Sequence, residues 1–290
     1  MLCPALRTLR IVLGPILLLV LAQCAPASRE ADPALWRVEG RNGEVAWLFG
    51  TIHAADGPMK WKTPDVARAL AASDEIVVEV ADMDPKRLTA QFDALSHTAN
   101  LPPLLERVPP SDRKALATRL DDLGLEHDAF ADVETWAAAM TLARAAASNA
   151  DPSYGIDRAV IAAAGNRPVR ELEGADAQLR IFDALPEEEQ RDLLRAILVD
   201  PDAGERALPD SWARGDMEAI VRETKRGLLA DPELRAALFT GRNKRWVDKI
   251  VARLGAGHRP FVAVGAAHLA GPEGLPALLA AAGYRVIRVR

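Results

Sequence analysis

Short apolar runs near both ends of the chain predict β-strands. The runs 35–39 and 45–49 lie on either side of an Asn-Gly pair, which is the strongest short signal for a β-hairpin. The run 75–80 is rich in β-branched residues and predicts a buried strand whose one internal charge is Glu79. Further strands are predicted at 167–172, 261–264 and 284–289.

Between these runs, apolar residues recur three or four positions apart, which is the spacing of amphipathic helices. Proline and glycine mark the ends of most of these stretches. The predicted helices are 64–72, 85–97, 111–123, 133–148, 155–164, 175–185, 186–198, 210–228, 232–254 and 274–282. Gly241 is a point at which the helix 232–254 can bend.

The order of these elements predicts an α/β fold. Strand–helix–strand units at the N- and C-terminal ends build a central mixed sheet, and a large helical insertion occupies the middle, at about 85–250. We expect residues 28–290 to form a single domain, because no linker or low-complexity segment divides them.

The two strand–helix–strand units share a motif. One apolar run leads into Gly50 and then His53, and the other leads into Gly265 and then His268, so each unit contains Gly-x-x-His. A Gly-Pro pair follows each histidine within five residues. This similarity between the two units can be explained by an ancient duplication or by two independent units of similar composition.

Both histidines are expected at the same edge of the sheet as Glu79. A strand–helix–strand unit crosses over right-handed and leaves its strands parallel, and open α/β sheets bind ligands beyond the carboxyl ends of their strands. His53 and His268 each follow such an end, and Glu79 lies at the end of the strand after His53. Because glycine has no Cβ, Gly50 and Gly265 let the backbone turn or approach a ligand closely.

Two imidazoles and a carboxylate are suitable ligands for zinc, manganese, cobalt or iron(II). We therefore predict that His53, His268 and Glu79 hold a divalent metal with open positions for water and substrate. The pattern leaves open whether Glu79 is a ligand or the general base. It also leaves open a metal-free site with His53 as base, and purely structural histidines.

Four other residues are candidates for supporting roles. Arg242, followed by Asn243, can clamp an anionic group or stabilise an oxyanion, although a solvated helix face explains the pair equally well. Asp157 lies in the first turn of a predicted helix, where a negative charge favours the helix dipole. Glu173 follows a predicted strand and is a third carboxylate that can reach the site.

Composition argues against a nucleic-acid partner. The 290 residues are 49% hydrophobic, with a net charge of −5 and a pI near 5.7, whereas nucleic-acid-binding domains carry a basic patch. We expect a peptide or a small-molecule substrate instead.

Residues 1–27 have the pattern of a signal peptide. Two arginines precede an apolar stretch at 11–22, which is short for a membrane span, and small residues at 25–27 provide a cleavage site. We expect export to the periplasm or cell envelope of a bacterium. A membrane attachment through an uncleaved N-terminal segment and a lipoprotein modified at Cys24 are alternatives. The other cysteine, Cys3, also lies in this segment, so no disulfide framework or thiolate site is expected.

Six short segments occur in a fixed order: 48–53, 77–79, 154–157, 172–173, 242–243 and 264–269. This set resembles the TraB/PrgY/GumN family, and its GumN-like branch in particular, from about Trp47 to the C-terminus. That family has two Gly-x-x-His motifs with a glutamate and an arginine between them, which correspond here to Glu79 and Arg242. It is similar to the Tiki metalloproteases and to the erythromycin-esterase and ChaN-like group. The resemblance implies a hydrolase centre formed by His53, His268 and Glu79.

The sequence therefore predicts a metal-dependent, peptidase-like hydrolase of the cell envelope that uses manganese, cobalt or zinc. One alternative is a non-catalytic envelope protein that binds a peptide or another ligand. A second alternative is a metal-independent esterase with His53 as base.

Overall fold

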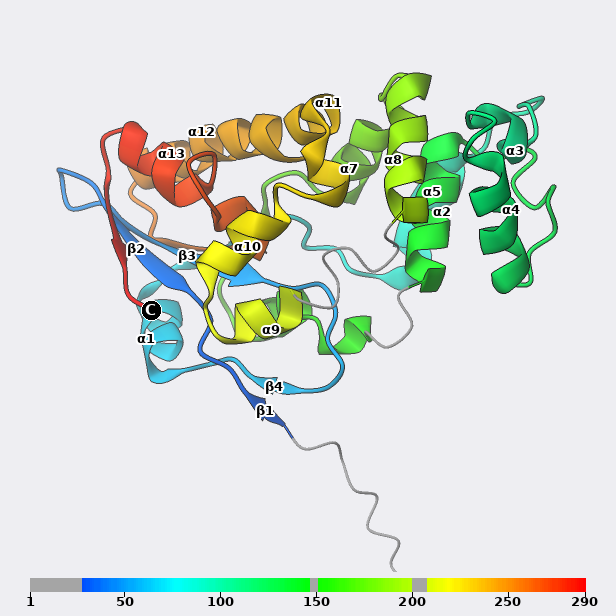
Figure 1. Cartoon of the computed structure of the whole chain (residues 1–290). Helices are drawn as coiled ribbons and strands as arrows, with labels where there is room; N and C mark the ends of the chain where they lie inside the picture. Colours follow the sequence, from blue (N-terminus) through cyan, green and yellow to red (C-terminus); the bar gives the residue numbers. More distant parts are fainter. Residues whose placement is uncertain (1–27, 147–150, 200–207) are drawn as a thin grey trace, which may run out of the picture.

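The computed structural model describes residues 28–146, 151–199 and 208–290 (Figure 1). The predicted signal peptide at 1–27 lies outside the described residues, as do the end of the predicted helix 133–148 and residues 200–207. The described part consists of a sheet, helices on both of its faces, and a helical region at one end (Figure 1).

A mixed sheet of six strands forms the centre of the fold. In spatial order the strands are β6 (Val169–Glu171), β5 (Glu75–Val78), β7 (Pro260–Gly265), β3 (Val45–Thr51), β2 (Leu35–Glu39) and β8 (Arg285–Arg288). The first four are parallel, and β2 is antiparallel to both of its neighbours. Two short strands, β1 (Arg29–Glu30) and β4 (Met59–Lys60), form a separate parallel pair.

Helices cover both faces of this sheet. One face packs against α1 (Pro64–Ala72), α6 (Ile156–Ala162), α9 (Leu208–Ala213) and α10 (Met217–Glu223), and the other against α12 (Gly241–Gly255) and α13 (Leu275–Ala281). Successive side chains of a strand point to opposite faces. Phe49 and Phe261 therefore belong to the first core, whereas Leu48 and Val262 belong to the second.

The middle of the chain forms a helical region with its own core. Its elements are α2 (Pro85–Ser96), α3 (Leu104–Arg107), α4 (Arg113–Asp122), α5 (Thr135–Ala146), α7 (Ala175–Asp183), α8 (Glu187–Val199), η2 (Gly227–Ala230) and α11 (Pro232–Arg235). Trp136, Leu194 and Leu234 are buried there, apart from the two cores of the sheet. This bundle lies at the right of Figure 1.

One long helix joins the helical region to the sheet. It runs through α11, a π-helical turn η3 (Ala236–Thr240) and α12 without interruption. The helix predicted at 232–254 is thus present, and a π-helical turn lies just before Gly241, the position expected to allow a bend.

The predicted α/β class, the N-terminal hairpin and the helical middle are confirmed. The prediction of one helix over 210–228 is wrong, because the chain there forms α9, α10 and η2. Gly215 interrupts it with a φ of 62°, a left-handed conformation that ends helices, and Asp216 caps α10. The strand predicted at 75–80 ends at Val78, which places Glu79 just after the strand.

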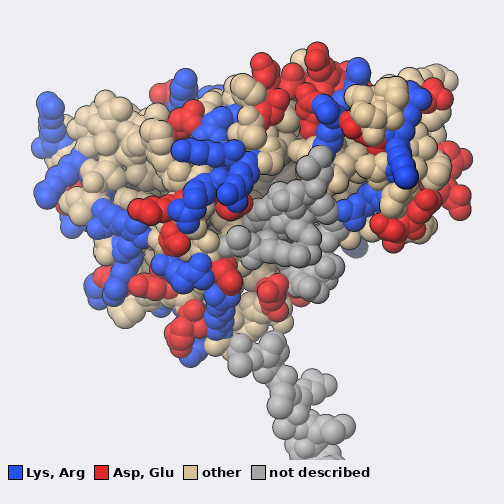
Figure 2. Space-filling view, in the orientation of Figure 1, with Lys and Arg blue, Asp and Glu red and all other residues tan. Residues whose placement is uncertain are grey.

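Among the residues that the structure describes, no helix combines the length and the apolar character that a membrane crossing requires. Figure 2 shows Lys and Arg side chains interspersed with Asp and Glu over the visible face. Neither sign of charge covers that face alone.

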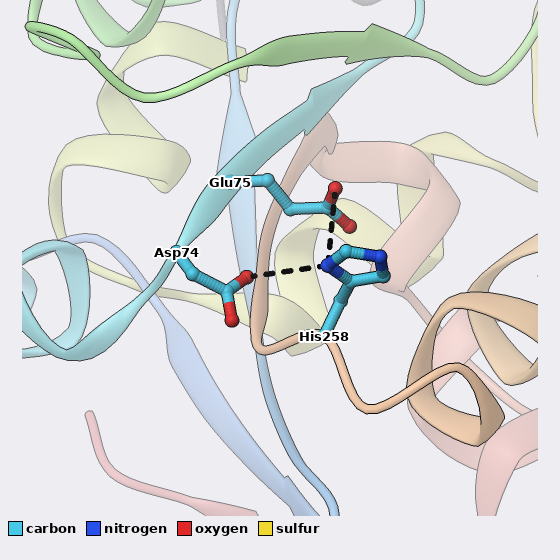
Figure 3. Close-up of side chains that lie close together, drawn as sticks. All are labelled: Asp74, Glu75 and His258. Carbon is cyan, nitrogen blue, oxygen red and sulfur yellow. Dashed lines mark ion pairs between the residues drawn. The ribbon is translucent and has the colours of Figure 1, made fainter.

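A cluster of charged side chains lies at the amino-terminal end of β5. Asp74, Glu75 and His258 have potential ligand atoms within 4.8 Å of one another, and His258 Nδ1 is 4.0 Å from both carboxylates (Figure 3). Glu75 is buried, however, and its carboxylate accepts from both Nε, at 2.8 Å, and Nη2 of Arg253. The cluster is therefore an ion-pair network that fastens α12 to the sheet.

Replacing Arg253 with methionine is expected to lower the free energy of unfolding by about 2 kcal/mol at neutral pH, because it leaves the buried Glu75 carboxylate unpaired. Urea-induced unfolding measures this loss. Arg259→Met is the matched control, since Arg259 is largely exposed and 3.6 Å from Asp74, and we expect a change below about 0.5 kcal/mol. Equal losses in the two variants would contradict the assigned role of Arg253.

Candidate functional site

The two Gly-x-x-His motifs lie side by side at the carboxyl ends of β3 and β7. These strands are adjacent and parallel, and Gly50 pairs with Val264 while Thr51 pairs with Gly265. β5 lies on the other side of β7, so Glu79 follows the next strand along the same edge. The sheet thus gathers the three residues from opposite ends of the chain.

Gly265 keeps open the space on which the three side chains converge. A Cβ at this position would lie 3.3 Å from Glu79 Oε1, 3.7 Å from His268 Cδ2 and 3.9 Å from His53 Nε2. Gly50 has a different role, since a Cβ there would lie 3.1 Å from Ala266. Glycine at Gly50 therefore lets the turn after β7 pack on β3, whereas glycine at Gly265 leaves room beside the candidate ligands.

Glu79 is buried and accepts hydrogen bonds at both oxygens. Oε1 accepts from the backbone N–H of Gly265 at 2.7 Å. Oε2 accepts from Gln178 Nε2 and from Arg242 Nη2, both at 2.8 Å. Burial alone would raise the pKa of Glu79, but the positive charges that His268, Arg242 and His53 can carry, together with the Gly265 N–H, lower it to about 2. The carboxylate is thus held as an anion.

His53 is oriented by a short chain of hydrogen bonds. Its Nδ1 lies 2.7 Å from Asp157 Oδ2, and Thr51 Oγ1 donates to Asp157 Oδ1. The attraction of the Asp157 carboxylate raises the pKa of His53 to about 9. The His53 side chain is 75% exposed, whereas that of Asp157 is 11% exposed, so His53 forms the open side of the site.

The start of α6 is docked on the turn that carries His53, and this contact brings Asp157 to the imidazole. The Ile156 N–H donates to Ile52 O at 2.8 Å. A Cβ at Gly155 would lie only 2.4 Å from His53 O, so only glycine allows this approach. The carboxylate predicted to favour the helix dipole thus also contacts a candidate ligand.

His268 is buried in the short helical turn η4 (Ala266–Leu269) and contacts two aromatic rings. The ring centroids of Phe239 and Trp246 are 5.4 Å and 4.4 Å from that of the imidazole. Burial lowers the pKa of His268 to about 4, so its ring is neutral at physiological pH. A neutral imidazole is the form that binds metals.

The tautomer of His268 follows from its neighbours. Asn243 Nδ2 donates to the backbone oxygen of Glu273 at 2.7 Å, which leaves Asn243 Oδ1 facing His268 Nδ1 at 2.6 Å. Nδ1 therefore carries the proton, and Nε2 keeps its lone pair. Arg242 Nη1 lies 3.4 Å from this nitrogen.

Arg242 lies between two buried carboxylates. Its Nη2 is 2.8 Å from Glu79 Oε2 and 2.9 Å from Glu173 Oε2, and its guanidinium group stacks on Trp246 at 4.7 Å from the ring centroid. Glu173 thus reaches the site through Arg242 rather than directly.

The donor set fits a divalent metal in part. Both histidines have their Nδ1 held by an oxygen, as is usual for metal-ligating imidazoles. Among the described residues, however, the ligand atoms of His53, Glu79 and His268 do not all lie within 4.8 Å of one another. The contacts of Arg242 with Glu79 and His268 account for part of the separation, because they fill directions that a metal would use.

Sequence reasoning missed four residues of this site. Thr51 and Trp246 are close in sequence to predicted site residues, and Trp246 follows Arg242 by four positions, so both had a signal of proximity. Phe239 precedes Arg242 by three positions and had the same signal, whereas Gln178 had none, since it reaches the site from the distant helix α7.

Comparison with protein-family models matches residues 34–288 to the TraB/PrgY/gumN family. Comparisons with curated proteins and with solved structures found no match. The matched range includes both Gly-x-x-His motifs, Glu79 and Arg242, and it covers most of the chain. The protein belongs to the TraB/PrgY/gumN family.

Proposed function

We propose that this protein is a metal-dependent hydrolase with peptidase-like chemistry, exported to the bacterial cell envelope by its N-terminal segment. The observation that carries the proposal is the convergence of His53, His268 and Glu79 on the space in front of Gly265. A second feature supports it, namely that each imidazole has its Nδ1 fixed by an oxygen acceptor.

Manganese, cobalt and zinc suit this set of nitrogen and oxygen donors. His53 and His268 would hold the metal through Nε2, and Glu79 through one carboxylate oxygen. When bound, such a metal polarises a substrate carbonyl and lowers the pKa of a water molecule.

The protein's own groups keep the candidate ligands in place. Asp157 fixes the orientation of His53, and Asn243 fixes the tautomer of His268. The pKa of Glu79 is lowered to about 2, which makes its carboxylate a weak proton acceptor, so we favour a ligand role over that of general base. Arg242 is a cation beside these groups that can also stabilise a negative oxygen of the substrate.

A second candidate is a metal-independent esterase with His53 as base. The chain Thr51–Asp157–His53 favours it, because a buried carboxylate on Nδ1 is how hydrolases orient a basic imidazole. In that mechanism, Nε2 of His53 takes a proton from the attacking water once the imidazole is neutral, and a pKa of about 9 places this activity at alkaline pH. Asp157 stabilises the imidazolium that results.

Chelation distinguishes the candidates. We expect protein purified without added metal to contain a divalent ion by elemental analysis, and to lose hydrolysis of a peptide library after EDTA dialysis. Manganese, cobalt or zinc should restore it. Ester hydrolysis that survives EDTA and disappears in Asp157→Asn would favour the esterase. Protein with neither metal nor activity, before and after metal addition, would favour a non-catalytic binding protein.

A further inference from the structure

The long helix from Pro232 to Gly255 contains one residue more than a regular α-helix would. The extra residue is taken up in η3, where the Gly241 N–H donates to Ala236 O, five residues back, instead of four. Such π-helical turns are rare and occur often at functional sites.

The π-helical turn lies where the helix passes from one core to another. Leu234 and Leu238, four residues apart, are buried in the core of the helical region. Trp246, Ile250 and Leu254, also four apart, are buried against the sheet. Because each residue of an α-helix turns by about 100°, loss of the extra residue would rotate one face by that angle relative to the other.

Gly241 is needed for a steric reason and not for its conformational freedom. Its φ and ψ are −66° and −38°, which any residue adopts in a helix. A Cβ there would lie 2.7 Å from Ala236 O, however, which is the oxygen that closes the π-helical turn. Any larger residue must push this backbone carbonyl away and so open the turn.

Four side chains around His268 and Glu79 come from this turn and the residues just after it. Phe239 stacks on the His268 ring, Asn243 fixes its tautomer, and Trp246 also packs against the ring. Arg242 bonds Glu79. Residues 239, 242, 243 and 246 all contact the candidate site because the extra residue sets the rotation of the helix there.

We propose that Gly241 and the π-helical turn Ala236–Thr240 position Phe239, Arg242 and Asn243 around His268, so that Gly241 is a positioning residue for the candidate metal site. The part of this proposal that concerns metal binding rests on the proposed function. The part that concerns the surroundings of His268 does not.

Gly241→Ala in the full exported chain tests the proposal, with Gly255→Ala as the matched control. Gly255 ends the same helix, and nothing lies within 4 Å of a Cβ built there. In an ordinary helix, alanine in place of glycine is stabilising. We expect Gly255→Ala to raise the melting temperature and Gly241→Ala to lower it.

Two readouts separate positioning from stability. In NMR spectra of the metal-free protein, the His268 ring protons should lose the shielding of Phe239 and Trp246 in Gly241→Ala but not in Gly255→Ala. The affinity for manganese or cobalt should fall about tenfold or more in Gly241→Ala, since Asn243 supports a ligand. Unchanged His268 resonances in a folded Gly241→Ala protein would overturn the proposal.

A variant that keeps the backbone covers the case in which Gly241→Ala does not fold. Phe239→Leu retains an apolar helical residue but removes the ring that stacks on His268. We expect the same direction of change in the His268 resonances and in metal affinity, and no change in either contradicts the proposal. If the resonances shift while no variant and no wild-type protein binds metal, the positioning role stands and the proposed function fails.

Discussion

Replacing both His53 and His268 with alanine is expected to remove the divalent metal and the metal-dependent hydrolysis that we propose for this protein. No other imidazole among the described residues lies at this edge of the sheet, so nothing can replace the lost nitrogen ligands. Elemental analysis of the purified variant and turnover of a peptide library measure the two losses. Full metal occupancy in this double variant would contradict the proposed function.

The two histidines differ in what their loss does to stability. His53 is largely exposed but is bonded to the buried Asp157 carboxylate, so His53→Ala should lower the free energy of unfolding by about 1 kcal/mol. His268 is buried, and its loss leaves the side-chain oxygen of Asn243 unpaired at a cost of about 2 kcal/mol. His53→Ala is therefore the cleaner single test of metal binding. His97→Ala with His127→Ala serves as control, because both of these histidines are exposed and distant in sequence.

Arg242→Ala is expected to lower the free energy of unfolding by about 4 kcal/mol at neutral pH, the largest loss of stability predicted for this chain. The side chains of Glu79 and Glu173 are 9% and 7% exposed, and both would lose their main cation. Arg245→Ala is the matched control from the same helix. Arg245 is 57% exposed and 3.8 Å from Glu173, so its loss should cost less than about 0.5 kcal/mol.

The stability of the Arg242→Ala variant should depend less on pH than that of the wild type. In the wild type, the pKa of Glu79 is lowered to about 2, so its contribution to stability is present above the unfolded value of 4.5 and is lost as the pH falls. Without Arg242 this pKa is lowered less, because only His268, His53 and the Gly265 N–H still act against burial, so the variant has less stability to lose as the pH falls. Urea unfolding at pH 7 and pH 3 measures the difference between variant and wild type, and a difference that is the same at both pH values would contradict this account.

The geometry of the sheet edge could be predicted from the sequence, because it depends on local rules. The crossover rule predicts that β3 is parallel to β5, and β7 lies between them and is parallel to both, so the Gly-x-x-His spacing places His53 and His268 at one edge. Glu79 followed from the single charge in an apolar run. The rules need no knowledge of how distant elements pack.

The remainder of the site depends on tertiary packing and had no local signal. Gln178 reaches Glu79 from the helical region, and that approach is set by a separate hydrophobic core. The π-helical turn could not be predicted from the sequence either, since residues 236–240 have ordinary helical composition and Gly241 indicated only a possible bend. Gly215, by contrast, did carry a turn signal, and the prediction of one helix over 210–228 overlooked it.

The position of β7 in the sheet has a consequence for when the sheet can form during synthesis of the chain. β7 lies between β5 and β3, so two strands from the first third of the chain cannot close the sheet until residues 260–265 have been made. A nascent chain has Glu79 and His53 but neither Gly265 nor His268. Such contacts between distant parts of the chain form late in folding. The candidate site is therefore assembled only when synthesis of the chain is nearly complete.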